Sequence, residues 1–349
     1  MPEGDRGRSP CTKTRLNTMT NGRRTDGVIN EASALEEAGH LREALSKWRE
    51  VIAQEATAVS LCRFGRVAAQ LKEWREAEQA LHAAIAAAPE WSLPLEVLAL
   101  VYRDQGALEK AEGYLRRSLS SEKKARTLTL LGDVLQRQGK TAEAKAALEA
   151  AIRLDDSYEE AYFLLAQANR DDPQKAMPLY RRAIDLDPSY GPAHRELGWV
   201  LRRLNLLDDA ADHVRRAIDA DYNDSWPLIY LGNILWAKED IQGAEVAFRR
   251  ATAIDPSSAV AYWCLADLMK SQGRLQEARR LLRLSLRANV NSVEANLRFA
   301  LLLRDVGELR KANRYLQRVL RLEPTNRVAR SLLGLPVERP FESDGPPSA

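Results

Sequence analysis

One alanine recurs at almost constant spacing along most of this chain. Its copies lie 32 to 34 residues apart, and every aligned position is an alanine: Ala44, Ala77, Ala111, Ala144, Ala176, Ala210, Ala244, Ala278 and Ala312. Spacing this regular indicates an internal repeat, in which each short unit buries its apolar face against its neighbours. The chain should therefore fold as an array of similar units stacked in order, and not around one central core.

The repeated unit is clearest in Ser225–Ser258, where the apolar spacing predicts two helices joined by a polar turn. The first helix has one apolar face, formed by Leu228, Leu231, Gly232 and Leu235. The second helix repeats this pattern after the turn, with Ala244, Phe248 and Ala251. We expect Ser225 to cap the first helix. Asp255-Pro256 should end the second, because the residue before a proline is pushed out of the helical region.

A second small residue recurs about twelve residues before most of these alanines. The position holds only glycine or alanine: Ala32, Gly65, Ala99, Gly132, Ala166, Gly198, Gly232, Ala266 and Ala300. Where two helices cross closely, one residue on each must be small or the backbones cannot approach. The two small positions together predict a close helix crossing inside every unit.

With these residues the repeat resembles the tetratricopeptide repeat, whose 34-residue helix–turn–helix unit carries a similar Leu-Gly, Ala, Phe and Pro pattern. The closing proline is present in four units, at Pro89, Pro188, Pro256 and Pro324. The resemblance implies an all-α, right-handed α-solenoid of about nine tetratricopeptide-like repeats. It places their boundaries at 25–57, 58–91, 92–124, 125–158, 159–190, 191–224, 225–258, 259–292 and 293–326.

Both ends of the chain differ from the repeats. Residues 1–24 are polar and basic, without apolar periodicity, so we expect a disordered tail. Residues 327–335 are expected to form a helix that caps the last apolar face, because repeat arrays need such an end. Residues 336–349 are Pro-rich and are expected to form a second disordered tail.

The sequence offers little for catalysis or for a cofactor. Its histidines fall on different predicted helices without metal-ligand spacing: His40, His82, His194 and His213. Gly139-Lys140-Thr141 resembles the end of a phosphate-binding loop but lacks the required glycine spacing. We therefore expect no enzyme, no cofactor, no metal site and no small-molecule substrate.

Charge, hydropathy and cysteine content narrow the expected partners and the expected location of the protein. The net charge is only +3, so nucleic acid is not an expected partner. No run of 18 apolar residues is present, so no membrane span is expected. The N-terminus lacks the apolar core of a signal peptide. The three cysteines, Cys11, Cys62 and Cys264, are far apart, which favours reduced thiols and a cytoplasmic location.

Two features of the repeats allow two interpretations each. In the fifth repeat the predicted turn is two residues shorter and Pro178 falls inside the second helix, which indicates a tolerated deletion or a bend in the array. Arginine pairs recur on the second helices, as at Arg215-Arg216 and Arg249-Arg250. They form either a solvated outer face or a surface for an anionic partner.

Aromatic residues gather on the first helices of repeats six to eight, which hold four of the seven tryptophans. In the family that the repeat resembles, the first helices line a concave groove. The resemblance implies a ligand groove at Phe163, Arg195, Trp199, Trp226, Tyr230, Asn233, Trp236, Trp263 and Asp267. Tryptophan, tyrosine and arginine dominate binding hot spots, which favours a groove for a partner. Packing between adjacent repeats and self-association are the alternatives.

We therefore predict a non-enzymatic scaffold or adaptor that binds a peptide or protein segment in the concave groove, centred on repeats five to eight. Two alternatives stay open at this point: an accessory subunit of an enzyme or secretion complex, and a structural protein that associates with itself. The expected partner is thus another protein chain or a second copy of this one.

Overall fold

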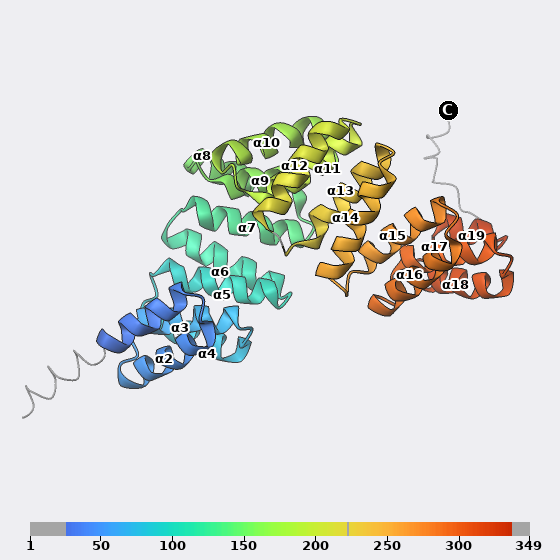
Figure 1. Cartoon of the computed structure of the whole chain (residues 1–349). Coiled ribbons are helices and arrows are strands. Elements are labelled where there is room, and N and C mark those ends of the chain that lie inside the picture. The colour runs from blue at the N-terminus through green and yellow to red at the C-terminus, as the bar shows by residue number, and fades with distance from the viewer. Residues whose placement is uncertain (1–25, 222, 337–349) are drawn as a thin grey trace, which may run out of the picture. The chain divides into compact units, whose positions relative to one another are not determined.

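A computed structural model describes residues 26–221 and 223–336 (Figure 1). Helices joined by short turns make up these residues, and no strand occurs among them, which confirms the predicted all-α fold. The chain divides into two compact units, Met1–Leu179 and Tyr180–Ala349, and each is described here by itself. The predicted basic tail 1–24 and residues 337–349 of the predicted C-terminal tail lie outside the described residues.

The first unit begins with a helical segment over residues 26–37. Its further helices are α2 (Leu41–Gln54), α3 (Ala58–Gln70), α4 (Trp74–Ala87), α5 (Ser92–Asp104), α6 (Leu108–Ser121), α7 (Ala125–Arg137), α8 (Thr141–Leu154) and α9 (Glu159–Ala168). The most extensive packing joins consecutive helices as α3 with α4, α5 with α6 and α7 with α8. Each of these pairs falls within one of the predicted repeats.

The second unit repeats the same pairing. Its helices are α11 (Gly191–Arg203), α12 (Leu207–Ala220), α13 (Ser225–Ala237), α14 (Ile241–Ile254), α15 (Ala259–Ser271), α16 (Leu275–Ala288), α17 (Val293–Asp305), α18 (Leu309–Leu322) and α19 (Arg327–Leu332). The first helices α11, α13, α15 and α17 also contact one another in sequence order. They therefore form a continuous layer on which a groove can be built. At the end, Ala329 of α19 is fully buried and packs with Ala300, Leu316 and Val319.

Helix α10 (Pro173–Leu186) spans the boundary between the units and continues through Pro178. The interval between Ala166 and Ala176, the two small residues of this repeat, is short. We expected a shorter turn to be the cause. Instead, the missing residues come from the preceding helix. Helix α9 has 10 residues, whereas α7 and α11 each have 13. Asp172 holds the start of α10, because its carboxylate accepts the main-chain N–H groups of Gln174 and Lys175 at 3.2 and 3.3 Å. Pro173 then occupies the first helical position, which it favours.

The recurring small residues lie where the paired helices cross. All nine recurring alanines have no exposed surface. A Cβ atom added to Gly232 would lie 2.5 Å from Cε1 of Phe248, and one added to Gly132 would lie 2.5 Å from Cγ of Leu148. Neither glycine therefore leaves room for a side chain, and this close approach is the physical reason why a small residue recurs at this place.

The turns inside the helix pairs need a residue in the left-handed region. Gly39, Gly106, Gly139, Gly273 and Gly307 adopt φ values between 74° and 80° at this point. Lys72, Asn205 and Glu239 adopt φ values of 60° to 63° at the equivalent turn although each carries a side chain. The backbone conformation is thus required by the turn, whatever residue occupies it.

Helix α13 has a different cap from the one we expected. Ser225 is its first helical residue, and Asp224 is the cap, with its carboxylate accepting the N–H of Trp226 at 2.9 Å. A carboxylate at this place also interacts favourably with the positive end of the helix dipole, which explains why Asp224 takes the role.

Candidate interaction groove

The first helices of the second unit surround a hollow of about 690 Å³. Residues from α11, α13 and α15 line it, together with the turn before α17, the start of α17 and Glu323 at the end of α18. Five of the nine residues expected in the groove take part: Trp199, Trp226, Tyr230, Asn233 and Trp263. We call this hollow the aromatic groove.

Trp226 is the most accessible large aromatic side chain of the groove, with 44% of its surface exposed. It is the second residue of α13, where Asp224 holds its main-chain N–H. The ring lies 6.2 Å from that of Tyr230, one helical turn further on, and the two ring planes meet at 59°. Exposing a large aromatic surface to water is costly, so this pair offers a ready site for an apolar side chain of a partner.

Trp263 belongs to a cluster that joins α15 to α17. The guanidinium carbon of Arg298 lies 3.8 Å from the centre of the Trp263 ring. Arg298 also donates from Nε to Oδ2 of Asp267 at 2.7 Å. Asp267 thus neutralises Arg298 and helps to hold it on the indole ring, while Trp263 still lines the groove. Asp267 itself does not line the hollow, so its role is to support Trp263.

Arg195 also lies beside the groove and not in it. It donates to Oε1 of Glu196 at 3.2 Å and to Oδ2 of Asp224 at 3.0 Å. Burial opposes the charge of Arg195, but the carboxylates of Glu196 and Asp224 outweigh it and raise the pKa of Arg195 above its ordinary value. Through Asp224 this ion pair connects α11 to the cap of α13, and it therefore positions the residue that holds Trp226.

Asn233 and Cys264 form the inner part of the lining. The Asn233 amide nitrogen donates to the carbonyl oxygen of Ile229 at 3.0 Å. Cys264 is only 2% exposed, and burial raises the pKa of its thiol to about 12. The thiol therefore stays protonated at neutral pH, which makes it a packing residue and a poor nucleophile.

Two expected groove residues lie elsewhere. Phe163, in α9 of the first unit, is only 7% exposed and offers little surface to a ligand. Trp236, near the end of α13, is half-buried and does not line the aromatic groove. Since both were placed by repeat position alone, the position does not decide exposure, which depends on the neighbouring helices.

The polar edge of the groove was not predicted from the sequence. Asn289, Asn291 and Ser292 come from the turn between α16 and α17, and Glu294 and Glu323 complete this edge. Asn289 Oδ1 accepts the N–H of Asn291 at 3.0 Å, and Ser292 caps α17. The Asn and Ser residues signal a turn in the sequence, but nothing in their spacing indicates that the turn borders a groove.

The chemistry of the groove suits binding. Four aromatic side chains line it, from Trp199, Trp226, Tyr230 and Trp263, together with amide, hydroxyl and carboxylate groups. Within residues 26–221 and 223–336, no group of three histidine, cysteine, aspartate or glutamate side chains could hold a metal ion. No helix in the same residues is long and apolar enough to cross a membrane.

Comparison with protein families gives one consistent match. One family model described as tetratricopeptide repeat matches residues 62–125, 129–191 and 169–225. A second model with the same description matches residues 235–301. No curated protein matches this chain in sequence.

Solved structures share the fold at low sequence identity. One is a chain of the crystal structure of the APC/C hetero-tetramer Cut9–Hcn1, with a TM-score of 0.60 and 17% identity. The match covers 84% of this chain but only 58% of that one. Another is PilF of Pseudomonas aeruginosa, with a TM-score of 0.52 and 21% identity, where the match covers 60% of this chain and 96% of the other. At these identities the likeness concerns the fold alone.

Proposed function

Because this chain belongs to the tetratricopeptide repeat family, we propose that it is a non-enzymatic scaffold that binds a segment of another protein in the aromatic groove. The supporting observation is the exposed Trp226 ring, which lies beside Tyr230 above a hollow large enough for several side chains. Aromatic anchors in a concave site carry much of the binding energy in protein interfaces. The proposal places the site on repeats six to eight, with Glu294 and Glu323 of its polar edge on repeat nine.

The groove suits a partner segment of mixed character. Trp226, Tyr230 and Trp263 offer apolar contacts, so the segment should insert at least one large apolar side chain. The carboxylates of Glu294 and Glu323 border the same hollow and accept hydrogen bonds. They suit the main-chain N–H groups of an extended peptide or a lysine or arginine near the apolar anchor.

We also propose a cytoplasmic location. Cys62 and Cys264 are buried free thiols in the described part of the chain, far from each other in sequence. Free cysteines are typical of compartments that keep thiols reduced. Measuring the redox state of these two cysteines in intact cells by thiol labelling would test this placement.

The binding proposal is tested with two variants of the full-length chain. Trp226→Ala removes the exposed anchor, and Val246→Ala removes an exposed apolar side chain from α14 that does not line the groove. Partners are captured from an extract of the native cell and identified by mass spectrometry. A hot-spot tryptophan contributes about 2 kcal/mol or more, so Trp226→Ala should reduce recovery of the true partner about thirtyfold or more. Val246→Ala should leave recovery unchanged.

Two results would contradict the proposal. Equal recovery with the wild-type chain and with Trp226→Ala would mean that the partner binds elsewhere. The second result would be a molar mass, measured by light scattering, that rises with protein concentration for the wild-type chain but not for Trp226→Ala. The groove would then hold a second copy of this chain instead. Because Trp226 is exposed, its replacement should change stability by only about 0.5 kcal/mol, so loss of binding would not reflect unfolding.

A further inference from the structure

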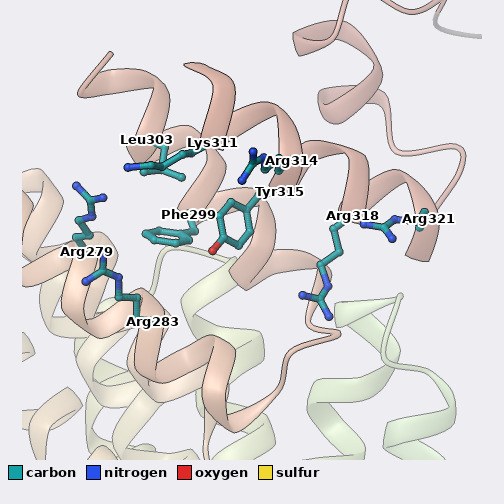
Figure 2. A pocket seen from close by; sticks show the side chains of 9 residues that line it. All are labelled: Arg279, Arg283, Phe299, Leu303, Lys311, Arg314, Tyr315, Arg318 and Arg321. Atoms are coloured by element: carbon teal, nitrogen blue, oxygen red, sulfur yellow. The ribbon is translucent and has the colours of Figure 1, made fainter. Parts of the chain in front are cut away.

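A second hollow, of about 420 Å³, lies among α16, α17 and α18 at the end of the second unit. Basic side chains form most of its wall: Arg279, Arg283, Lys311, Arg314, Arg318 and Arg321. Figure 2 shows them around the rings of Phe299 and Tyr315, with Arg279 and Arg283 on one side and Arg318 and Arg321 on the other. We call this hollow the cationic cleft. It is separate from the aromatic groove, since the two share no lining residue.

Most of the charge in the cationic cleft is not neutralised. Glu308 pairs with Arg279 at 2.7 Å and with Lys311 at 2.6 Å. Among the described residues, no carboxylate lies within 4 Å of the guanidinium groups of Arg283, Arg314, Arg318 or Arg321. Four arginines therefore surround one opening without a local counter-charge, although like charges this close repel one another.

Two arginines at the place of Arg283 on earlier second helices are paired instead. Arg116 contacts Glu112 at 2.8 Å and Glu143 at 3.1 Å. Arg249 contacts Glu245 at 2.6 Å and Glu277 at 3.1 Å. In each case one carboxylate comes from the same helix and the other from the next second helix. Arg283 thus lacks a counter-charge at a place in the repeat where Arg116 and Arg249 each have two.

The spacing of the cations matches a short extended chain. Lys311, Arg314, Arg318 and Arg321 follow one face of α18 over ten residues, which is about 15 Å at the rise of a helix. An extended peptide covers this length with about five residues. Each arginine presents a planar fork of donors that suits a carboxylate, so one cleft can hold several carboxylates at once.

We infer that the cationic cleft is a docking site for a short acidic segment of a partner protein, with clustered aspartate or glutamate side chains. The site goes beyond the proposed function, because it lies on other helices and binds by charge where the aromatic groove binds by apolar contact. Tyr315 adds a half-buried ring at the centre of the cleft, against which the apolar part of such a segment can rest.

Two observations favour an acidic peptide over nucleic acid. A single-stranded nucleic acid stacks its bases on exposed aromatic rings and follows a continuous basic track. Here Phe299 is only 3% exposed, and Tyr315 lies edge-on to it with the ring centres 4.8 Å apart, so neither forms an open stacking platform. Unpaired charge is also interrupted at Arg249, which Glu245 and Glu277 neutralise.

The test uses the full-length chain and a fluorescein-labelled octaglutamate peptide as probe. Binding is followed by fluorescence anisotropy at about 50 mM salt, because charge contacts are only partly screened there. Arg314→Gln together with Arg318→Gln removes two unpaired cations of the cleft. This variant should bind the probe about tenfold more weakly than the wild-type chain, because each lost contact is a charge-assisted hydrogen bond.

The matched control is Arg215→Gln together with Arg249→Gln, which removes the same net charge from arginines already paired with carboxylates. Its affinity for octaglutamate should stay within about twofold of the wild-type value, since paired cations contribute little. Equal weakening in both variants would overturn the site, because binding would then follow net charge alone. Failure of the wild-type chain to bind octaglutamate would also overturn it. A different result would be an octathymidylate probe that binds more tightly than octaglutamate and loses affinity in the same cleft variant. That result would identify nucleic acid, and not an acidic peptide, as the ligand of the cleft.

Discussion

His194 and His213 meet across the first helix pair of the second unit, with their Nδ1 atoms 2.9 Å apart. The other ring nitrogen of His194, Nε2, lies 3.1 Å from the carbonyl oxygen of Pro188 and must therefore carry a proton to donate. Neutral His194 then has an acceptor at Nδ1, and His213 donates its Nδ1–H to it. The pair joins α11 to α12 only while at least one of the two rings is neutral, because one Nδ1 must accept.

This contact predicts that the second unit loses stability in mild acid. Burial lowers the pKa of His194 and of His213, and the nearby Arg216 lowers both further. Asp187 and Asp209 raise them but do not outweigh burial. As the pH falls, the unfolded chain therefore takes up protons before the folded chain does. The free energy of unfolding that the two histidines contribute is full above the ordinary histidine pKa of 6.5 and falls as the pH drops below it.

Denaturant unfolding between about pH 8 and pH 5 measures this effect, because histidine is the side chain that titrates there. Each proton taken up on unfolding lowers the free energy of unfolding by at most about 1.4 kcal/mol per pH unit. His213→Gln keeps a donor for His194 and removes one titrating group, so it should flatten the slope. A slope unchanged by this substitution would show that the pair does not control the pH dependence.

Gly232→Ala should destabilise the helix crossing in the seventh repeat. The added methyl group would lie 2.5 Å from Cε1 of Phe248, whose ring is fully buried and cannot move aside easily. Overpacking of this kind costs about 1–3 kcal/mol. Gly113→Ala is the matched control, because nothing lies within 4 Å of the added atom and the residue is in the exposed part of α6. Thermal unfolding should give a lower midpoint for the first variant and an equal or higher one for the second.

Glu239→Gly should make the chain more stable. Glu239 has a φ of 63° in the turn between α13 and α14, where five equivalent turns use glycine. A side chain in the left-handed region costs about 1 kcal/mol, and glycine removes this cost although it adds freedom to the unfolded chain. The midpoint of thermal unfolding should rise slightly. Gly273→Ala, at the equivalent turn with a φ of 74°, should lower it, and a rise in both variants would contradict the explanation.

Pro178→Ala should also stabilise the chain. Pro178 is the sixth residue of α10, and the main-chain N–H that it lacks would bond to the carbonyl of Gln174. Restoring this bond should raise the free energy of unfolding by about 1–3 kcal/mol. Pro173→Ala, at the first position of the same helix, restores no bond, because the first helical N–H groups have no partner inside the helix. Urea unfolding of both variants separates the two positions, and equal effects would rule out the hydrogen bond as the cause.

Paired helices and their crossings could be predicted from sequence because they depend on residues close together in one unit. Gly232 and Ala244 are separated by a single turn, so their small size constrains the local crossing wherever the unit lies in the array. The same argument holds for the left-handed turns at Gly39, Gly106 and Gly139, whose backbone geometry is local. The period and the fold class follow from such local constraints repeated many times.

Exposure and charge balance, in contrast, depend on side chains that come from different repeats. The sequence predicted Phe163 and Trp226 alike as groove residues, but neighbouring helices bury Phe163 and leave Trp226 exposed. It also predicted a stripe of arginines without indicating which of them are paired. Arg249 reaches Glu277 on the next second helix, 28 residues away. Only the tertiary structure brings such residues within reach of each other, because the distance between repeats is set by packing and not by spacing along the chain.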